Sequence, residues 1–158
     1  MGKQHKFQLQ TTWTGNAGQG TADYRAYKRD HEISGDGKQA PIPGSSDPVF
    51  RGDGSRYNPE ELLVGSISAC HMLWMLHLCA DAGIVVTEYS DAASGMMAEE
   101  PDGGGRFTEV TLHPRITITD ETRIAEVEAL HAKAHELCFI ARSVNFPVHH
   151  SAVTVARR

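Results

Sequence analysis

The sequence lacks the features that disulfide-stabilised, nucleic-acid-binding and secreted proteins depend on. Its 158 residues include only three cysteines and 7% aromatic residues, and the formal net charge is −5. It contains no long basic run, so no nucleic-acid partner is expected. The first ten residues, MGKQHKFQLQ, have no apolar segment of the signal-peptide type. Three cysteines in such a chain predict free thiols in a reducing, cytoplasmic compartment.

Charge is also missing from one long internal stretch. Residues 62–80 contain no Asp, Glu, Lys or Arg. Asn58 and Pro59 before this stretch suit the N-cap and first turn of a helix, and Gly83 after it suits a C-terminal cap. The sequence therefore predicts one helix over residues 58–83. Because this helix is apolar on nearly every side, we expect it to be buried.

A membrane span is the competing interpretation of this stretch. Nineteen uncharged residues are just long enough to cross a bilayer. However, the stretch includes polar residues such as His71 and His77, and neither end carries Lys or Arg to set an orientation. We therefore expect no membrane partner.

The rest of the chain alternates between strand and helix patterns. The length and the 40% apolar content fit a single soluble domain over residues 1–158. A second, amphipathic helix is expected at about 121–143. The order of elements predicts an α+β fold with an antiparallel sheet. Strands are expected at residues 7–14, 22–33, 84–99 (bent or bulged near Gly95), 106–119 and 152–156, with a hairpin turn at 101–105 and a long loop at 41–57.

Cys70 lies in the middle of the first predicted helix. Cys79, nine residues later, points to the opposite side of that helix, so the two cannot share a site within one chain. The face around Cys70 is mostly apolar, which would raise the pKa of a thiol and leave it inert. The residues alone therefore favour a buried, unreactive Cys70. A reactive one would need a cation from elsewhere, and the loop upstream supplies arginines, while Cys138 supplies a second thiol for a redox cycle.

Two segments of the sequence resemble a known family. The segment Asn58-Pro59-Glu60-Glu61-Leu62-Leu63, followed by Ser68-Ala69-Cys70, is similar to the signature of the OsmC/Ohr family of osmotically inducible and organic hydroperoxide resistance proteins. Glu60 precedes Cys70 by ten residues, as in the family pattern, and Cys138 matches the late second cysteine. The resemblance implies antiparallel sheets wrapped around two long central helices in an intertwined homodimer.

The resemblance also implies an activity and a set of roles. Cys70 would be the peroxidatic thiolate of a thiol peroxidase that reduces organic hydroperoxides to alcohols, and Cys138 would form a disulfide with it. An external dithiol of the lipoyl type would reduce that disulfide, and no cofactor is implied. Glu60 would hold an arginine against the Cys70 thiolate. Arg51 is the candidate for this role, with Arg29 and Arg56 as the alternatives.

Helix geometry adds one expectation to this set of roles. Ten residues of helix separate Glu60 from Cys70 by about 15 Å, too far for the carboxylate to serve that thiol directly. We therefore expect the Arg–Glu pair that serves Cys70 to come partly from the other chain. The sequence also departs from the family pattern, because Phe139 follows Cys138 where a proline is usual.

Three other functions are compatible with the same residues. His131, His135 and Cys138 share one face of the second predicted helix and could bind zinc, although solvated histidines are the ordinary interpretation. A Cys70–His77 hydrolase is disfavoured by the two helical turns between these residues. A non-enzymatic protein that binds a hydrophobic ligand is the third alternative.

Overall fold

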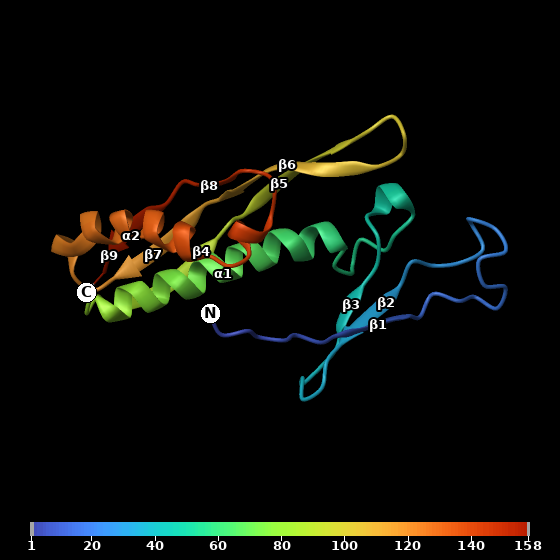
Figure 1. Cartoon of the computed structure of the whole chain (residues 1–158), viewed down its shortest axis with the longest axis horizontal. Helices are drawn as coiled ribbons and strands as arrows, with labels where there is room; N and C mark the ends of the chain where they lie inside the picture. The colour runs from blue at the N-terminus through green and yellow to red at the C-terminus, as the bar shows by residue number, and fades with distance from the viewer. Residues whose placement is uncertain (1, 158) are drawn as a thin grey trace. The chain divides into compact units, whose positions relative to one another are not determined.

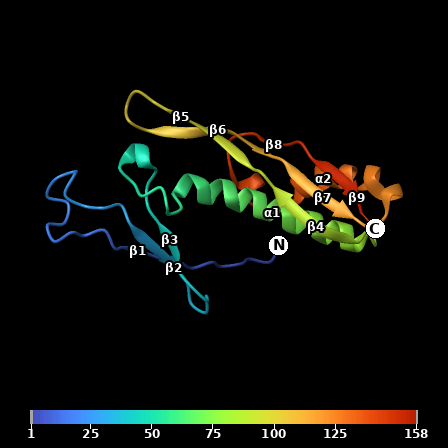
Figure 2. The same cartoon turned by 180° about the vertical axis from the view of Figure 1, so that it is seen from behind.

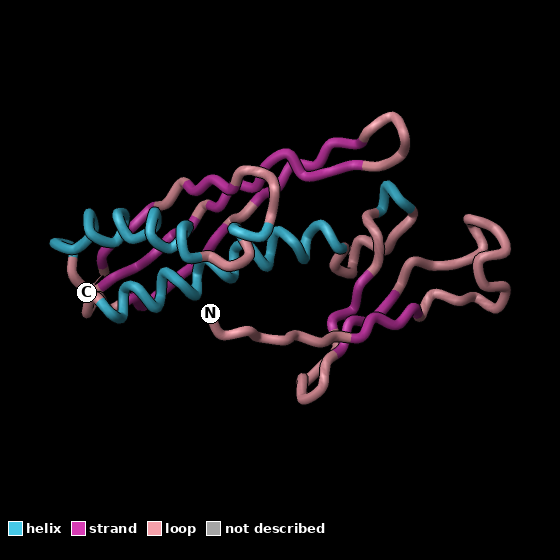
Figure 3. The backbone as a smooth tube through the Cα atoms, in the orientation of Figure 1, coloured by secondary structure: helices cyan, strands magenta, loops and turns pink. Residues whose placement is uncertain are grey.

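The computed structural model describes residues 2–157, which form two compact units, residues 2–62 and 63–157. Figure 1 shows two α-helices and a set of short strands, and Figure 3 shows that loops make up much of the first unit. The helices and strands are β1 (Gln10–Trp13), β2 (His31–Ser34), β3 (Ile42–Gly44), η1 (Pro48–Phe50), α1 (Pro59–Asp81), β4 (Val86–Asp91), β5 (Ser94–Glu99), β6 (Gly105–Leu112), β7 (Pro114–Ile118), η2 (Glu121–Arg123), α2 (Ile124–Leu137), η3 (Ala141–Ser143), β8 (Val148–His150) and β9 (Val153–Ala156).

The first unit is built on a small antiparallel sheet. Strands β1, β2 and β3 pair in that order, so the strand predicted at 7–14 is present but shorter. The strand predicted at 22–33 is wrong over most of its length. The chain turns there because the Arg29 guanidinium donates to the carbonyls of Tyr27 and Tyr24, at 2.6 and 2.8 Å. It also lies over both tyrosine rings, a favourable cation–π arrangement.

Helix α1 begins and ends where its capping residues predict. The Asn58 side chain accepts from the Glu61 amide at 2.7 Å, and the Glu61 carboxylate accepts from the Asn58 amide at 3.1 Å, which is a capping box. At the other end, Gly83 has φ +69°, and the Ile84 amide donates to the Cys79 carbonyl at 2.8 Å. This left-handed glycine and its 6→1 bond form a Schellman cap.

The prediction that α1 is buried on nearly every side is wrong for this chain. Only a stripe at four-residue spacing is buried, formed by Ile67, His71, Met75 and Cys79. Leu73, by contrast, is 62% exposed. Among residues 2–157, α1 is the one helix long and apolar enough to cross a membrane. Its buried stripe packs in the two core clusters of the second unit.

The second unit contains two sheets rather than one antiparallel sheet. Strands β4, β7 and β9 form the first, and β5, β6 and β8 form the second. The pairs β7–β9 and β6–β8 are parallel, so the predicted all-antiparallel arrangement is wrong. Residues 84–99 form two strands of different sheets, with a bulge at Met96/Met97. The hairpin turn at 101–105 is confirmed, with Gly103 at φ +87°.

The second helix is shorter than predicted. Residues 121–123 form a 3-10 turn instead, and α2 ends at Leu137 because Cys138 adopts an extended conformation with ψ 110°. Its buried positions are Val127, His131 and Ala134. The core brings these together with Met75 and Cys79 of α1 and with Ile116 and Ile118 of β7. From the reverse side, Figure 2 shows β4, β7 and β9 beside the C-terminal part of α1. The second unit therefore packs α1 and α2 together against this sheet.

Candidate functional site

The two cysteines that the sequence singles out lie next to each other. Cys70 is at the middle of α1 and is half-buried, whereas Cys138 directly follows α2 and is fully buried. The two sulfurs are close enough that Cys70 acts as a hydrogen-bond partner on the pKa of the Cys138 thiol. Both cysteines are free. The packing of α1 on α2 thus brings together two thiols separated by 67 intervening residues of sequence, as a reversible disulfide requires.

Burial and the neighbouring Cys70 sulfur both act on the pKa of the Cys138 thiol. Burial, followed by the bond to Cys70, raises the pKa of Cys138 to about 11. The Ala141 amide opposes this shift by donating to the Cys138 sulfur at 3.4 Å. The Cys138 thiol therefore keeps its proton at neutral pH and can act as a donor.

A small apolar pocket opens onto Cys70. It has a volume of about 250 Å³ and is lined by Cys70, Leu73, Trp74, His77 and Phe139. The Trp74 and Phe139 rings meet edge to face with centroids 5.8 Å apart. Phe139 is 69% exposed and stands where the family pattern has a proline. The half-buried thiol is thus reached through a hydrocarbon-lined opening that suits an apolar molecule.

Cys79 has the structural role that the sequence predicts. It is fully buried in the core cluster with Met75 and Ile116. Burial and then the negative charge of Glu126 raise its pKa. Cys79 therefore fills the core as a small apolar residue and has no redox partner among residues 2–157.

The three candidate arginines belong to the first unit and differ in their contacts. Arg29 is held by Tyr24 and Tyr27, as described above. Arg56 lies 3.9 Å from Asp30 and 3.8 Å from Asp53. Arg51 is exposed, has φ +66°, and forms no ion pair within residues 2–157. Of the three guanidinium groups, that of Arg51 is the one that forms neither a hydrogen bond nor an ion pair with its own unit, among the described residues.

Glu60 belongs to the first unit, two residues before its last residue in sequence. It is half-buried in the first turn of α1, and it is Glu61 rather than Glu60 that closes the capping box. Arg51 borders a polar hollow of about 290 Å³ with Lys28, Asp30 and Asp53. The cysteines are thus brought together by the second unit, while Arg51 and Glu60 remain residues of the first.

The predicted zinc alternative is not supported by the structure. Within residues 2–157, no group of three or more His, Cys, Asp or Glu side chains is arranged to hold a metal ion. The solvated interpretation of His131 is also wrong, because this side chain is 1% exposed and bonds to His71. His77 borders the Cys70 pocket, but its nearest ionic partner is Asp81, at 3.4 Å. No histidine among the described residues hydrogen-bonds to Cys70, so the hydrolase alternative also lacks a base.

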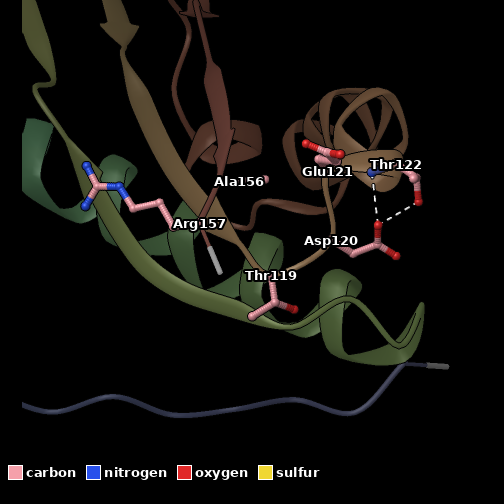
Figure 4. Close-up of a pocket in the computed structure, with 6 residues that line it drawn as sticks. All are labelled: Thr119, Asp120, Glu121, Thr122, Ala156 and Arg157. Atoms are coloured by element: carbon pink, nitrogen blue, oxygen red, sulfur yellow. Dashed lines mark hydrogen bonds between the residues drawn. The ribbon is translucent and has the colours of Figure 1, made fainter.

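A second hollow of the same unit has a different character. Figure 4 shows it at the start of α2, lined by Thr119, Asp120, Glu121, Thr122, Ala156 and Arg157, with a volume of about 310 Å³. The Asp120 carboxylate accepts from the amide and the hydroxyl of Thr122, as an N-cap residue does. These bonds complete a helix start, and the lining contains no cysteine.

Fold and site together define a class of protein. It is a small α+β protein in which two packed helices present a pair of contacting thiols beside an apolar pocket. A family model described as OsmC-like protein matches residues 52–152. The chain belongs to this OsmC-like family, as its sequence signature predicts. A search of curated proteins gave no match.

Solved structures agree with this assignment. An OsmC-like protein of unknown function from Vibrio cholerae superposes with a TM-score of 0.85 at 29% identity, covering 95% of this chain and 100% of that one. An organic hydroperoxide resistance protein from Elizabethkingia anophelis gives a TM-score of 0.67 at 20% identity, covering 98% and 100%. Another such protein, OsmC from Legionella pneumophila, gives 0.66 at 20%, covering 96% and 98%. At these lower identities the likeness concerns the fold.

The sequence analysis missed the histidines at the centre of this unit. His71, His131 and His150 come from α1, α2 and β8, and their rings lie side by side with centroids 5.3 to 5.7 Å apart. A signal was present, because His71 occupies the same four-residue stripe as Ile67 and Met75. The position of His131 between Val127 and Ala134 gave the same signal on α2. The partners could not be identified, because they come from three separate elements.

Proposed function

We propose that the protein is a thiol peroxidase that reduces organic hydroperoxides to alcohols. The observation that carries this proposal is the proximity of the Cys138 thiol to the Cys70 sulfur at the apolar pocket. A half-buried nucleophile beside a second thiol is the arrangement that attack and resolution require. Family membership, and the names of relatives as organic hydroperoxide resistance proteins, support the same activity.

The reaction proceeds in two steps at these sulfurs. The Cys70 thiolate attacks the terminal oxygen of the hydroperoxide, so that an S–O bond forms and the O–O bond breaks. The alkoxide leaves as an alcohol after taking up a proton, and Cys70 becomes a sulfenic acid. Cys138 then attacks the Cys70 sulfur, a disulfide forms, and water leaves. An external dithiol, of the lipoyl type that the family resemblance implies, returns both thiols and is itself oxidised to a disulfide.

Replacing Cys138 by serine should separate these two steps. Cys70 remains in its pocket, so the first turnover should occur at close to the wild-type rate. Without the second thiol the sulfenic acid persists, and excess hydroperoxide oxidises it to sulfinic acid. Mass spectrometry of the Cys70 peptide should therefore show a gain of two oxygen atoms in Cys138→Ser, and an internal disulfide in wild type. An intact catalytic cycle in Cys138→Ser would contradict the resolving role.

The exposed side of α1 supports a homodimer. An apolar helix with only one buried stripe leaves Leu73, and to a lesser extent Leu76, facing solvent. Large exposed apolar surfaces on a folded chain mark interaction sites. A second copy is the partner that supplies a matching surface, because closed two-fold symmetry places the same helix opposite itself. We therefore propose that α1 is covered by its counterpart in a second subunit.

We further propose that Arg51, held by Glu60, activates Cys70 across this dimer. A guanidinium beside the thiolate would favour the ionised sulfur. Among the described residues, Arg51 is the candidate whose guanidinium forms neither an ion pair nor a hydrogen bond with its own unit. The helical distance from Glu60 to Cys70, about 15 Å, disfavours a pair that serves its own helix. Each site would then combine Cys70 of one subunit with Arg51 of the other.

Mixed dimers test the origin of the arginine. Arg51→Ala and Cys70→Ser homodimers should both be inactive, because each lacks one half of every site. When the two are unfolded together and refolded at equal concentration, half of the dimers are mixed and contain one complete site of two. About a quarter of wild-type turnover should therefore return. A mixture that stays inactive, or a fully active monomer, would rule out the shared site.

A ligand-binding role without catalysis is the second candidate. The apolar lining of the Cys70 pocket favours it, because such pockets bind hydrophobic molecules whether or not chemistry follows. A Vibrio cholerae relative, named a putative organic hydroperoxide resistance protein, has captopril bound in one of its active sites; it has a TM-score of 0.63 and 18% identity, and covers 96% of this chain and 93% of that one. Hydroperoxide turnover distinguishes the two candidates, since a binding protein would retain ligand affinity and show no turnover.

A further inference from the structure

Three histidines form a buried cluster where α1, α2 and β8 meet. His71 and His131 are each 1% exposed, and His150 is half-buried beside them. The Nε2 atom of His71 and the Nδ1 atom of His131 are 2.9 Å apart, so one ring donates to the other. Their planes lie within 10° of parallel, and the His150 ring stacks on both. Three elements that are distant in sequence are therefore joined through imidazole rings.

This cluster is the polar connection between the two helices of the cysteine site. Apart from the contact between Cys70 and Cys138 at the end of α2, the bond between His71 and His131 is the side-chain hydrogen bond that joins α1 to α2 among the described residues. His71 directly follows Cys70 on α1, and His131 lies two helical turns before Cys138. A change in the spacing or rotation of the helices at the histidines therefore displaces the sulfurs as well. All other described contacts between the helix interiors are apolar and fix their register less strictly.

The surroundings of the cluster provide little stabilisation for an added positive charge. Nε2 of His131 is buried and has no hydrogen-bond partner. The groups that face the cluster are mostly other histidines: His135 of α2 lies near both His71 and His150, and His149 lies near His150. Asp91 of β4 is the one acidic group that acts on His71, and its oxygens are already bonded to the Ser68 hydroxyl and the His113 amide, at 2.6 and 2.7 Å. A proton added to the cluster would therefore place one buried cation against several neutral or basic rings.

We propose that His71, His131 and His150 form an acid-sensitive latch that holds Cys70 against Cys138. With the rings neutral, the bond between His71 and His131 fixes α1 on α2 and keeps the two sulfurs in contact. When the rings take up protons, that bond is replaced by repulsion between buried cations, the helices part, and the disulfide can no longer close. The three histidines are positioning residues for the second step of the proposed peroxidase reaction, and the inference rests on that proposed function.

The latch can be tested without a peroxide. Dithiodipyridine oxidises Cys70 to a mixed disulfide and releases one thiopyridone. Cys138 then attacks the Cys70 sulfur, which closes the internal disulfide and releases a second thiopyridone. The rate of the second release measures how well Cys138 is held against Cys70. Because no hydroperoxide takes part, a failure here is distinct from a failure of the peroxidase proposal, which hydroperoxide turnover measures separately.

Two kinds of variant separate the hydrogen bond from the imidazole. His71→Leu removes the bond and should slow closure at pH 7 by at least about tenfold. The double variant His71→Gln with His131→Asn places amide groups near the positions of the bonded nitrogens, so it can keep a hydrogen bond that does not titrate. It should close at close to the wild-type rate at pH 7. His113→Gln, an exposed histidine of the same unit, is the matched control and should close like wild type.

The pH dependence of the closing rate then distinguishes a titrating histidine contact from ordinary packing. Both wild type and the Gln/Asn variant lose thiolate as the pH falls, so the ratio of their closing rates cancels this shared effect. We expect the ratio of wild type to variant to be near one at pH 7 and to fall about fourfold by pH 4, where the pKa values of His71 and His131 lie. Circular dichroism at each pH confirms that the chains compared are folded. A constant ratio in folded proteins, or a folded His71→Leu that closes at the wild-type rate, would overturn the proposal.

Discussion

Replacing Cys70 by serine should abolish hydroperoxide turnover, with a loss of at least about 10³-fold in rate. A hydroxyl at this position stays protonated and cannot displace an alkoxide from an O–O bond as a thiolate does. Cys138 cannot take its place, because Cys138 is buried and its pKa is raised to about 11. The measurement is the steady-state consumption of an organic hydroperoxide with a dithiol as reductant.

Cys79→Ala is the control for this experiment. Cys79 is a core residue on the same helix and lies outside the pocket, so its removal should leave turnover unchanged. A Cys70→Ser protein that turns over hydroperoxide at the wild-type rate would contradict the proposed function. If wild type itself shows no turnover but binds apolar ligands, the non-enzymatic alternative is the correct one.

Acid should unfold the protein earlier than its carboxylates alone would explain. Burial, followed by the nearby His131 and His150 rings, lowers the pKa of His71 to about 4, and the charge of Asp91 opposes this only in part. Burial and then His150 lower the pKa of His131 to about 4 as well. Between pH 6.5 and 4 the unfolded chain therefore binds more protons than the folded one. The stabilisation is complete above pH 6.5 and is lost as the pH falls towards 4.

The expected size of this effect follows from the two pKa values. From pH 7 to pH 5, one histidine lowered from 6.5 to about 4 reduces the free energy of unfolding by about 2 kcal/mol, and two by up to about 4 kcal/mol. Urea unfolding curves at several pH values measure the change. The His71→Gln, His131→Asn double variant should lose most of this pH dependence, while His113→Gln should keep it. Equal pH slopes in wild type and double variant would show that the histidines do not carry the effect.

The sequence predicted most reliably what neighbouring residues determine. The caps of α1 depend on residues within four positions of each helix end, and Asn58, Glu61 and Gly83 act where their chemistry indicates. The hairpin around Gly103 depends on its own turn. The pairing of β8 and β9 with β6 and β7 is parallel and joins distant parts of the chain, so local patterns could not reveal it.

The candidate site was predictable only in part for the same reason. Cys70 and Cys138 were identified through their resemblance to a family signature, and the contact between them follows from the packing of α1 on α2. Spacing alone favoured an inert Cys70. His131 was misjudged because a histidine on the flank of an apolar stripe is normally solvated, and its partner His71 lies 60 residues away in the sequence. Polar groups become core residues when a distant partner satisfies them, and a single sequence does not show that partner.

The narrow buried stripe of α1 also bears on the abundance of the protein in its cell. Leucines that face water in one copy are stabilised only when another copy covers them. In the proposed dimer, the free energy of unfolding falls when the protein is diluted and rises when its concentration increases, by mass action. Synthesis of more chains would then raise both the amount of protein and the stability of each folded chain, without any additional regulator.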